Sequence, residues 1–384
     1  MEQEVKEYGS LVEALDVLDE CNASKGEKWH SMIRFLDGKA RAKGVPFGAA
    51  LELTPLCNLD CKMCYVHLSS KQIRDSGKKI LSGDQWIALI DQAAEAGLMH
   101  VLLTGGEAML HPDFEKIFLH LRNKGMLITL NTNGVLLTEE RVAFFRRYPP
   151  TMIQITLYGA SEEEYERVTG HRAFSKVMAG IQRAKESHLV FEVGLTPNRY
   201  MDEYGKPLIR LLDSMQVFYS MNTGLFTPRA ETGRASENHD LTLDEYVDLY
   251  RLRAHLQGKE YTPVCQADVQ PIGGVSEEKP RGFKCAGGRS SFAITWDGAL
   301  QPCLMVDNIR YNLANARFSD EWEKLHHEVM EYPFPQECCG CPYQQICTVC
   351  IKQHAMGAPA GHANKALCER AQRLAFEGMI KKGN

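Results

Sequence analysis

From residue 47 onward, short apolar segments alternate with segments that have helical periodicity, and this alternation restricts the fold more than any other feature. Apolar runs bounded by turn residues predict strands, and the amphipathic segments between them predict helices. A succession of such units predicts an α/β fold with a parallel sheet, because parallel neighbours need a crossover connection. The predicted strands comprise residues 49–53, 99–104, 127–130, 152–157, 191–195 and 218–222.

Chemically distinctive residues lie at or just after the ends of the first four predicted strands. They are Cys57, Cys61 and Cys64 after the first strand, Gly105-Gly106-Glu107 after the second, Asn131-Thr132 after the third, and Thr156 in the fourth. Ligands of parallel α/β folds bind beyond the carboxyl ends of the strands. We therefore expect one site that gathers all of these residues.

Cys57, Cys61 and Cys64 have the spacing C-x3-C-x2-C. Three thiolates can hold three corners of a cubic four-iron cluster and leave the fourth iron without a protein ligand, whereas closed electron-transfer clusters use four cysteines. An open metal position is typical of catalytic sites. The alternative is a structural zinc site, for which His67 is the candidate fourth ligand.

The composition narrows the class of protein. The chain has 384 residues and a net charge of −5, which indicates neither a nucleic acid nor an anionic membrane as a partner. No apolar stretch approaches the length of a membrane span, and the N-terminus lacks the pattern of a signal peptide, so we expect a cytoplasmic protein. In a reducing compartment, 13 cysteines indicate metal sites rather than disulfides.

Three regions are predicted along the chain. Residues 1–46 form a helical segment, with a capping-box pattern at Ser10 and a second helix around Trp29 that ends near Gly44 and Pro46. Residues 47–235 carry the strand–helix units. Residues 236–384 include a bridging helix and, from about Tyr261, a region rich in cysteine, glycine and proline that predicts a small α+β domain.

The three-cysteine run, directly after an apolar strand, resembles the radical S-adenosylmethionine (SAM) superfamily, and Gly105-Gly106-Glu107 lies where that family has such a run. The resemblance implies a partial (β/α)6 TIM-like barrel. It also implies a [4Fe-4S] cluster whose open iron binds SAM, and reductive cleavage of SAM to a 5′-deoxyadenosyl radical. An electron donor such as flavodoxin or ferredoxin is a further implied partner.

The resemblance also implies contacts to SAM. Gly105, Gly106 and Glu107 would contact the amino group, and a bidentate arginine, Arg167 or Arg172, would pair with the carboxylate, unless these are solvated helix charges. The remaining expected contacts are Asn131 and Thr132 to the methionine or ribose part, Gln154 and Thr156 from the fourth strand, Tyr65 to the adenine, and Thr196 in the adenosyl pocket.

A second group of cysteines resembles the SPASM domain, a C-terminal extension of some radical SAM enzymes that holds two auxiliary [4Fe-4S] clusters. By that pattern the outer cluster is held by Cys338, Cys341, Cys347 and Cys368, and the inner one by Cys285, Cys303 and Cys350. The fourth inner ligand is Cys265, or else an iron there is open. A zinc ribbon would explain only the four cysteines from Cys338 to Cys350. Cys21 and Cys339 have no assigned role.

Auxiliary clusters near the substrate favour a net two-electron oxidation, because they can accept an electron from a substrate radical. We therefore predict a radical SAM oxidoreductase that forms a C–S or C–C cross-link, or a similar product, in a ribosomal peptide or protein. The candidates for a general base are Asp307, Tyr158 and His67.

Three alternatives remain open. One is an enzyme that acts on a small molecule in cofactor or natural-product biosynthesis, since no leader-binding module is recognisable. Another is an anaerobic sulfatase-type maturase, although Leu304 stands where that subfamily has an aspartate after the second SPASM cysteine. The third is a non-catalytic iron–sulfur protein.

Overall fold

The computed structural model describes residues 25–222, 228–234, 239–258, 282–339, 341, 343, 347, 350–356, 358–359 and 361–376. Its centre is a nine-stranded sheet with the order β6-β5-β4-β3-β2-β1-β7-β8-β9. The strands are β1 (Gly48–Glu52), β2 (His100–Thr104), β3 (Leu127–Thr132), β4 (Met152–Thr156), β5 (Phe191–Leu195), β6 (Tyr219–Met221), β7 (Ser291–Ile294), β8 (Ala299–Gln301) and β9 (Tyr311–Asn312).

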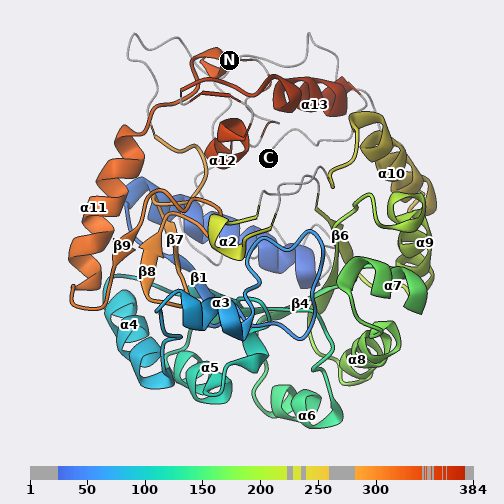
Figure 1. The fold of residues 1–384 in the computed structure, drawn as a ribbon, viewed down its shortest axis with the longest axis horizontal. Coiled ribbons are helices and arrows are strands. Elements are labelled where there is room, and N and C mark those ends of the chain that lie inside the picture. The colour runs from blue at the N-terminus through green and yellow to red at the C-terminus, as the bar shows by residue number, and fades with distance from the viewer. Residues whose placement is uncertain are drawn as a thin grey trace.

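The helices cover the outside of this sheet. In Figure 1, the outside of the strands is lined in turn by α4, α5, α6, α8, α7 and α9, α11 lies on the side of β8 and β9, and α12 and α13 lie in the upper part of the view. The helices are α2 (Lys25–Lys43), α3 (Ser70–Asp75), α4 (Gly83–Glu95), α5 (Phe114–Asn123), α6 (Glu139–Arg147), α7 (Glu162–Thr169), α8 (Phe174–Glu186), α9 (Lys206–Ser214), α10 (Leu243–Leu256), α11 (Phe318–Glu331), α12 (Ile351–Ala355) and α13 (Lys365–Phe376).

The parallel part of the sheet confirms the predicted α/β class. Strands β1 to β6 pair in parallel, each with its neighbour in sequence, which is the arrangement of a partial (β/α)6 barrel. Local sequence signals also set the ends of helices. Ser82 caps α4 in a capping box with Gln85, and α2 is followed by Gly44, whose positive φ of 65° ends the helix.

The C-terminal strands differ from the expectation of a separate small domain. β7 pairs in parallel with β1, so the cysteine-rich region extends the sheet of the barrel, and β8 and β9 continue it as antiparallel strands. The sequence pattern of residues 291–294 does not reveal this partner, because backbone pairing over a long chain separation leaves no local signal. The domain boundaries at 46 and 235 stay predictions.

Two predicted features lie outside the described residues. These are the capping box at Ser10 with the first N-terminal helix, and Cys265. The second N-terminal helix is α2, whose Asp37 side chain accepts a hydrogen bond from the Ser290 hydroxyl at 2.5 Å. Along the described ranges, no helix combines the length and the apolar character that crossing a bilayer requires.

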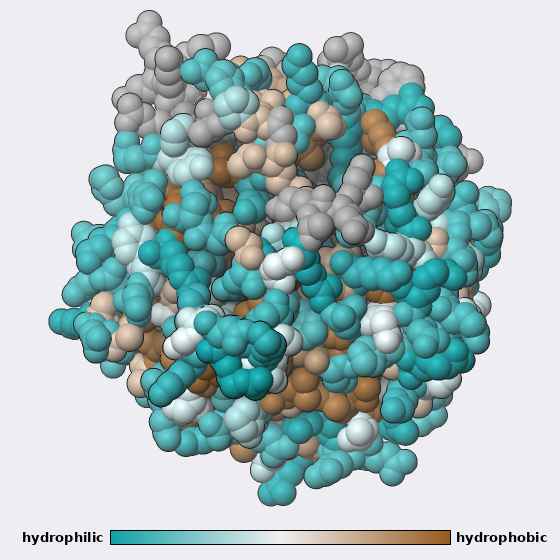
Figure 2. Space-filling model, viewed as in Figure 1, coloured by the Kyte–Doolittle hydropathy of each residue, from teal (hydrophilic) through white to brown (hydrophobic). Residues whose placement is uncertain are grey.

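Hydrophilic residues cover most of the visible surface and aromatic residues fill the interior, as expected for helices that pack on a sheet. The face in Figure 2 is mostly hydrophilic over the outer helices, and α3 forms a hydrophilic projection on it. Behind α5 and α6, an aromatic cluster fills the space between helices and sheet. Phe118 lies at its centre, fully buried, with ring centroids of Phe144 and Phe145 both 5.6 Å away.

Replacing Phe118 with alanine should lower the free energy of unfolding by about 3–5 kcal/mol, because it leaves a cavity among packed rings. Urea unfolding of the purified protein measures this. Met99→Ala is the matched control, since Met99 is 51% exposed, and it should shift the free energy by less than about 0.5 kcal/mol. Equal losses in the two variants would contradict the assigned core.

Candidate functional site

The three-cysteine loop begins directly after β1 and is held against the end of α7. The backbone N–H groups of Asp60 and Lys62 donate to the carbonyls of Thr169 and Val168 at 2.9 and 3.0 Å. The Cys64 N–H donates to the Cys61 carbonyl at 3.0 Å, which closes the turn that brings these two cysteines together. These hydrogen bonds give the loop its shape.

The loop lies on the glycines that follow β2. Gly106 donates to the Thr54 carbonyl and Glu107 to the Leu56 carbonyl, each at 2.8 Å. A Cβ atom on Gly105 or Gly106 would approach a backbone oxygen of the 54–56 segment at 2.3 Å, and Gly105 has a φ of 150°. Glycine is therefore required at both positions for the two backbones to meet.

A cavity of about 410 Å³ lies at this contact, beyond the carboxyl ends of the strands. All three cysteines line it, and the other predicted residues in its wall are Tyr65, Gly105, Gly106, Asn131, Thr132, Thr156, Tyr158 and Thr196. Among the described residues, the Oδ1 atom of Asn131 is buried without a hydrogen-bond partner, so it can accept from a bound ligand.

The cysteine loop fits a metal cluster. Burial raises the pKa of the Cys57 thiol to about 12, so the thiolate needs a positive charge nearby, which a metal supplies. The backbone N–H groups of Leu59 and His67 point at the sulfurs of Cys57 and Cys64, at 3.4 and 3.3 Å. Such N–H groups stabilise metal-bound thiolates. Cys57, Cys61 and Cys64 are thus suited to hold a [4Fe-4S] cluster.

His67 does not line this cavity. Its Nδ1 atom lies 3.1 Å from the Asp60 carboxylate and 3.4 Å from the guanidinium of Arg234. These contacts orient the ring toward polar partners on the outer side of the loop. This arrangement favours the three-cysteine interpretation over a zinc site that includes His67.

The Glu107 side chain is hydrogen-bonded to other residues of the protein. Its buried carboxylate accepts from the Thr132 hydroxyl and the Asn133 N–H, both at 2.9 Å, and from the Met109 N–H at 3.3 Å. It does not line the cavity. Glu107 therefore ties the end of β3 to the turn after β2, in place of the expected contact with the SAM amino group.

Three further expected SAM contacts also lie outside the cavity wall. Arg167 pairs with Asp202 at 2.5 Å, and Arg172 pairs with Glu163 and Glu166 on the surface of α7. Gln154 donates to the Glu192 carboxylate at 2.7 Å. Both arginines therefore have the solvated-charge environment that was the alternative interpretation.

The structure places further residues at the site. Asn133 donates to Asn58 at 2.7 Å and to the Cys57 sulfur at 3.6 Å, while Asn222, Met305 and Gln353 line the cavity. Asn222 follows β6, so the strand-end rule would have found it. Met305 and Gln353 come two and three residues after cysteines, and this proximity in sequence was the signal that could have predicted them.

The C-terminal cysteines fall into two groups. Burial raises the pKa of Cys303 to about 11, and the charges of Cys285 and Cys350 act in the same direction. Burial, followed by Cys368, Cys347 and Cys341, raises the pKa of Cys338 to about 12. The assignment of these sets to an inner and an outer cluster, which the SPASM pattern implies, stays a prediction.

Cys265, the candidate for the fourth inner ligand, lies outside the described residues, whereas other residues near the C-terminal cysteines can be placed. The Ser290 hydroxyl is engaged with Asp37, and Ser291 begins β7. Cys339 is exposed, with its sulfur 3.8 Å from the Pro335 carbonyl. The eleven described cysteines are all free of disulfides.

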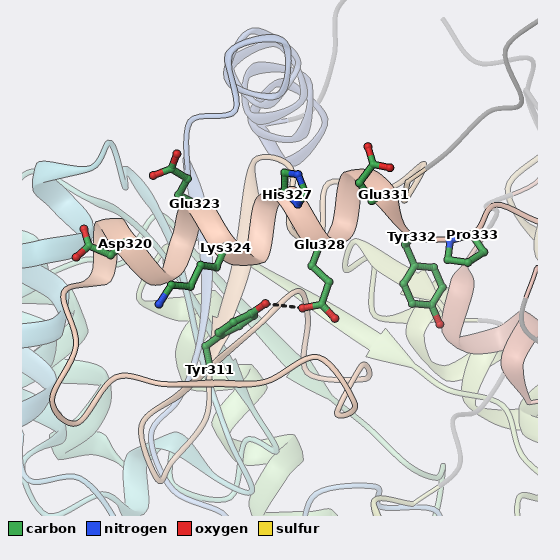
Figure 3. A pocket seen from close by; sticks show the side chains of 9 residues that line it. All are labelled: Tyr311, Asp320, Glu323, Lys324, His327, Glu328, Glu331, Tyr332 and Pro333. Atoms are coloured by element: carbon green, nitrogen blue, oxygen red, sulfur yellow. Dashed lines mark hydrogen bonds between the residues drawn. The ribbon is translucent and has the colours of Figure 1, made fainter.

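A larger hollow of about 890 Å³ lies elsewhere, along α11. Figure 3 shows Asp320, Glu323, Glu328 and Glu331 on this helix and the hydrogen bond from the Tyr311 hydroxyl to Glu328. No cysteine and no strand-end residue of β1 to β6 lines it. We therefore place the functional site at the smaller cavity.

The strand-end cavity and its three-cysteine loop define a partial-barrel protein built to hold a metal cluster and an organic ligand. Residues 51–200 match the Radical SAM superfamily. Residues beyond the matched segment contribute the two additional cysteine groups.

Similar proteins include enzymes of two kinds. The chain is 24% identical over 345 residues to an AdoMet-dependent heme synthase of Oleidesulfovibrio alaskensis, covering 83% of this chain and 86% of that one. It is 22% identical to the antilisterial bacteriocin subtilosin biosynthesis protein AlbA of Bacillus subtilis, covering 88% and 74%. The structure of Streptococcus suis SuiB bound to precursor peptide SuiA has the same fold, with a TM-score of 0.65 at 14% identity over 89% and 81% of the chains.

Gly106→Ala should lower the free energy of unfolding by about 1–3 kcal/mol and weaken SAM binding, because the new methyl group pushes the Leu56 carbonyl and the cysteine loop away. Urea unfolding and calorimetric titration with SAM measure the two effects. Gly38→Ala is the control: it is a helical glycine with open space around it, so alanine should stabilise α2. Normal SAM affinity in Gly106→Ala would contradict the close approach.

The buried Glu107 should make stability depend on pH. Desolvation raises its pKa from 4.5 to about 7, against the opposing hydrogen bonds from Asn133 and Thr132. Between these values the folded state binds more protons than the unfolded state, so the contribution of Glu107 to stability falls as pH rises from about 4.5 to 7.

The difference in unfolding free energy between the parent and Glu107→Gln should therefore change by at most about 3 kcal/mol across this range, and level off above it. Urea unfolding of the iron-free, reduced protein at pH 5, 6, 7 and 8 measures the change. Glu95→Gln, at an exposed position of α4, should show no such trend. Parallel pH profiles of the parent and Glu107→Gln would refute the assignment.

Proposed function

We propose that this chain is a radical SAM oxidoreductase that oxidatively modifies a peptide or protein substrate. The observation that carries the proposal is that one cavity is lined both by the three-cysteine loop and by Met305 and Gln353, which follow Cys303 and Cys350. A substrate in that cavity would lie between the SAM site and the inner auxiliary site. This placement suits a reaction in which an electron leaves the substrate.

Three [4Fe-4S] clusters are part of the proposal. The first is held by Cys57, Cys61 and Cys64, and the other two by the C-terminal groups described above. Cys265 is the candidate for the fourth inner ligand. When bound, the clusters and SAM supply a 5′-deoxyadenosyl radical that removes a hydrogen atom from a substrate carbon, and a route by which an electron leaves. We expect a flavodoxin or ferredoxin to reduce the protein.

The side chains of the cavity bind and orient the ligands. Asn131 offers its free Oδ1 as an acceptor, and the hydroxyls of Thr156 and Thr196 offer both donors and acceptors. Burial raises the pKa of Tyr158 well above its usual value, so its phenol stays neutral and acts as a hydrogen-bond donor. Tyr65 and Met305 provide apolar walls from opposite parts of the chain.

Of the three candidates for a general base, Tyr158 alone lines the cavity. Asp307 is paired with Lys352 at 3.1 Å, and His67 with Asp60. Neither the Asp307 carboxylate nor the His67 imidazole lines the cavity. The proton of an oxidised substrate would therefore leave through water or through the substrate itself.

The shape of the site supports an extended substrate. A second hollow of about 380 Å³ lies between the start of α10 and the helices α12 and α13, and Gln353 lines both hollows. A peptide whose reacting residue occupies the first hollow could therefore continue into the second. AlbA, by its name, serves the biosynthesis of a bacteriocin, and SuiB binds a precursor peptide.

A small-molecule reaction is the second candidate. The chain resembles AdoMet-dependent heme synthases over most of its length, and by their name those enzymes make a heme. The two hollows that share Gln353 would then hold one large planar ligand. Binding of an iron porphyrin, measured by its absorption spectrum, favours this candidate over the peptide.

The deciding experiment measures 5′-deoxyadenosine release from SAM by anaerobically reconstituted protein with a strong reductant. We expect release by the parent and none by Cys57/Cys61/Cys64→Ala. The parent should bind about twelve irons per chain, as three four-iron clusters require, and the triple variant about eight. If a parent protein that carries twelve irons released no 5′-deoxyadenosine, the clusters would have electron-transfer or structural roles, and the proposed enzyme activity would be rejected.

A further inference from the structure

Arg229 occupies a buried position between the cysteine loop and the C-terminal region. It lies in the short described segment 228–234, between β6 and α10, and its side chain is 7% exposed. Its Nη1 atom donates to both carboxylate oxygens of Glu52, at 3.0 and 2.9 Å. Its Nε and Nη2 atoms donate to the Leu304 carbonyl, at 3.2 and 2.9 Å.

The backbone of the same residue makes a third connection. The Arg229 N–H donates to the Tyr65 carbonyl at 3.1 Å. Tyr65 directly follows Cys64, and Leu304 directly follows Cys303. One residue therefore joins the loop of the SAM site to the loop of the inner auxiliary site, and Glu52 anchors both to the end of β1.

Burying Glu52 and Arg229 costs desolvation free energy, which suggests that the pair has a role other than stabilising the fold. Glu52 is fully buried, and desolvation raises its pKa to about 7 despite the neighbouring guanidinium. Buried ion pairs contribute little net stability relative to apolar residues of similar volume. A planar guanidinium can instead bind a carboxylate and a carbonyl at the same time in fixed directions, which an ammonium group cannot do.

We propose that Arg229 is a positioning residue that sets the distance between the SAM site and the inner auxiliary site. By holding the Leu304 carbonyl, its guanidinium fixes Cys303 on one side and Met305, in the cavity wall, on the other. The proposal builds on the function proposed above, in which Cys303 binds a cluster. The claim that Arg229 holds the two loops in place depends only on contacts within the protein.

Arg234 offers a matched comparison. Its guanidinium donates to the Cys61 carbonyl at 2.6 Å and pairs with Asp60, so it holds the SAM-site loop alone. It lies five residues from Arg229 on the same segment. A variant at Arg234 therefore tests whether any loss of a nearby arginine loosens both loops.

The first test is amide hydrogen exchange of the full chain in the parent, Arg229→Lys and Arg234→Met. Lysine keeps a positive charge beside Glu52 but cannot also hold Leu304. We expect exchange at Met305 and Val306 to rise about tenfold or more in Arg229→Lys, because charged hydrogen bonds to a carbonyl are lost. In Arg234→Met exchange should rise in residues 61–67 and stay at the parent level at Met305 and Val306.

Unchanged exchange at Met305 and Val306 in Arg229→Lys, or the same rise in Arg234→Met, would overturn the proposal. A third variant covers the case in which a buried lysine prevents folding. Glu52→Met with Arg229→Met removes both charges and should fold. It should show the same rise at Met305 and Val306, and parent-level exchange there would equally refute the role of the guanidinium.

The second test reads the distance between the metal sites. Electron paramagnetic resonance of the reduced, reconstituted protein reports the magnetic interaction between neighbouring clusters. We expect Arg229→Lys to bind the same number of irons as the parent but to show an altered magnetic interaction between the SAM-site cluster and the inner auxiliary cluster. Arg234→Met should keep the magnetic interaction between the two auxiliary clusters. An identical spectrum in Arg229→Lys would contradict the positioning role. No 5′-deoxyadenosine release by the parent would refute the proposed function and leave the exchange result standing.

Discussion

The close approach of two backbones underlies the whole site. The turn after β2 passes so near to the segment after β1 that Gly105 and Gly106 have no room for a side chain. Two hydrogen bonds of 2.8 Å hold the segments together. The three cysteines therefore begin at a fixed height above the sheet. The cavity, the cysteine loop and the turn at Glu107 all take their positions from this contact.

The continuous sheet makes the two cysteine regions parts of one structure. Because β7 hydrogen-bonds with β1, the strand that leads into the SAM-site loop also anchors the strand that precedes Cys303. Glu52 at the end of β1 then binds Arg229, which holds the carbonyl after Cys303. Backbone pairing and one buried ion pair thus relate sites that are more than 200 residues apart in sequence. An electron path between them requires such a fixed relation.

The sequence predicted the elements well where local patterns determine them. All six predicted strands agree with the structure to within two residues at each end, and the largest difference is at the end of β3, which extends to Thr132. Capping at Ser82 and the stop at Gly44 follow from backbone chemistry that acts over a few residues. The cavity residues predicted from strand ends, such as Asn131 and Thr156, also line the cavity. Parallel strands bring their carboxyl ends to one edge in any such fold.

Residues whose partners are distant in sequence were harder to place. Glu107, Arg167, Arg172 and Gln154 each have the chemistry of a ligand contact, yet other side chains of this protein engage them. No local pattern distinguishes a carboxylate that binds a ligand from one that binds a neighbouring turn. Arg229 shows the converse, since nothing in the sequence around it indicates that it is buried.

The sequence by itself determined the class of fold, the three-cysteine loop and the order of the C-terminal cysteines, because periodicity and spacing are properties of short segments. Tertiary structure alone decided that β7 joins β1, that Met305 and Gln353 line the cavity beside the three-cysteine loop, and that Arg229 joins the two cysteine loops. These contacts depend on which distant surfaces meet when the sheet and its helices pack. Their energies come from burial and pairing that exist only in the folded chain.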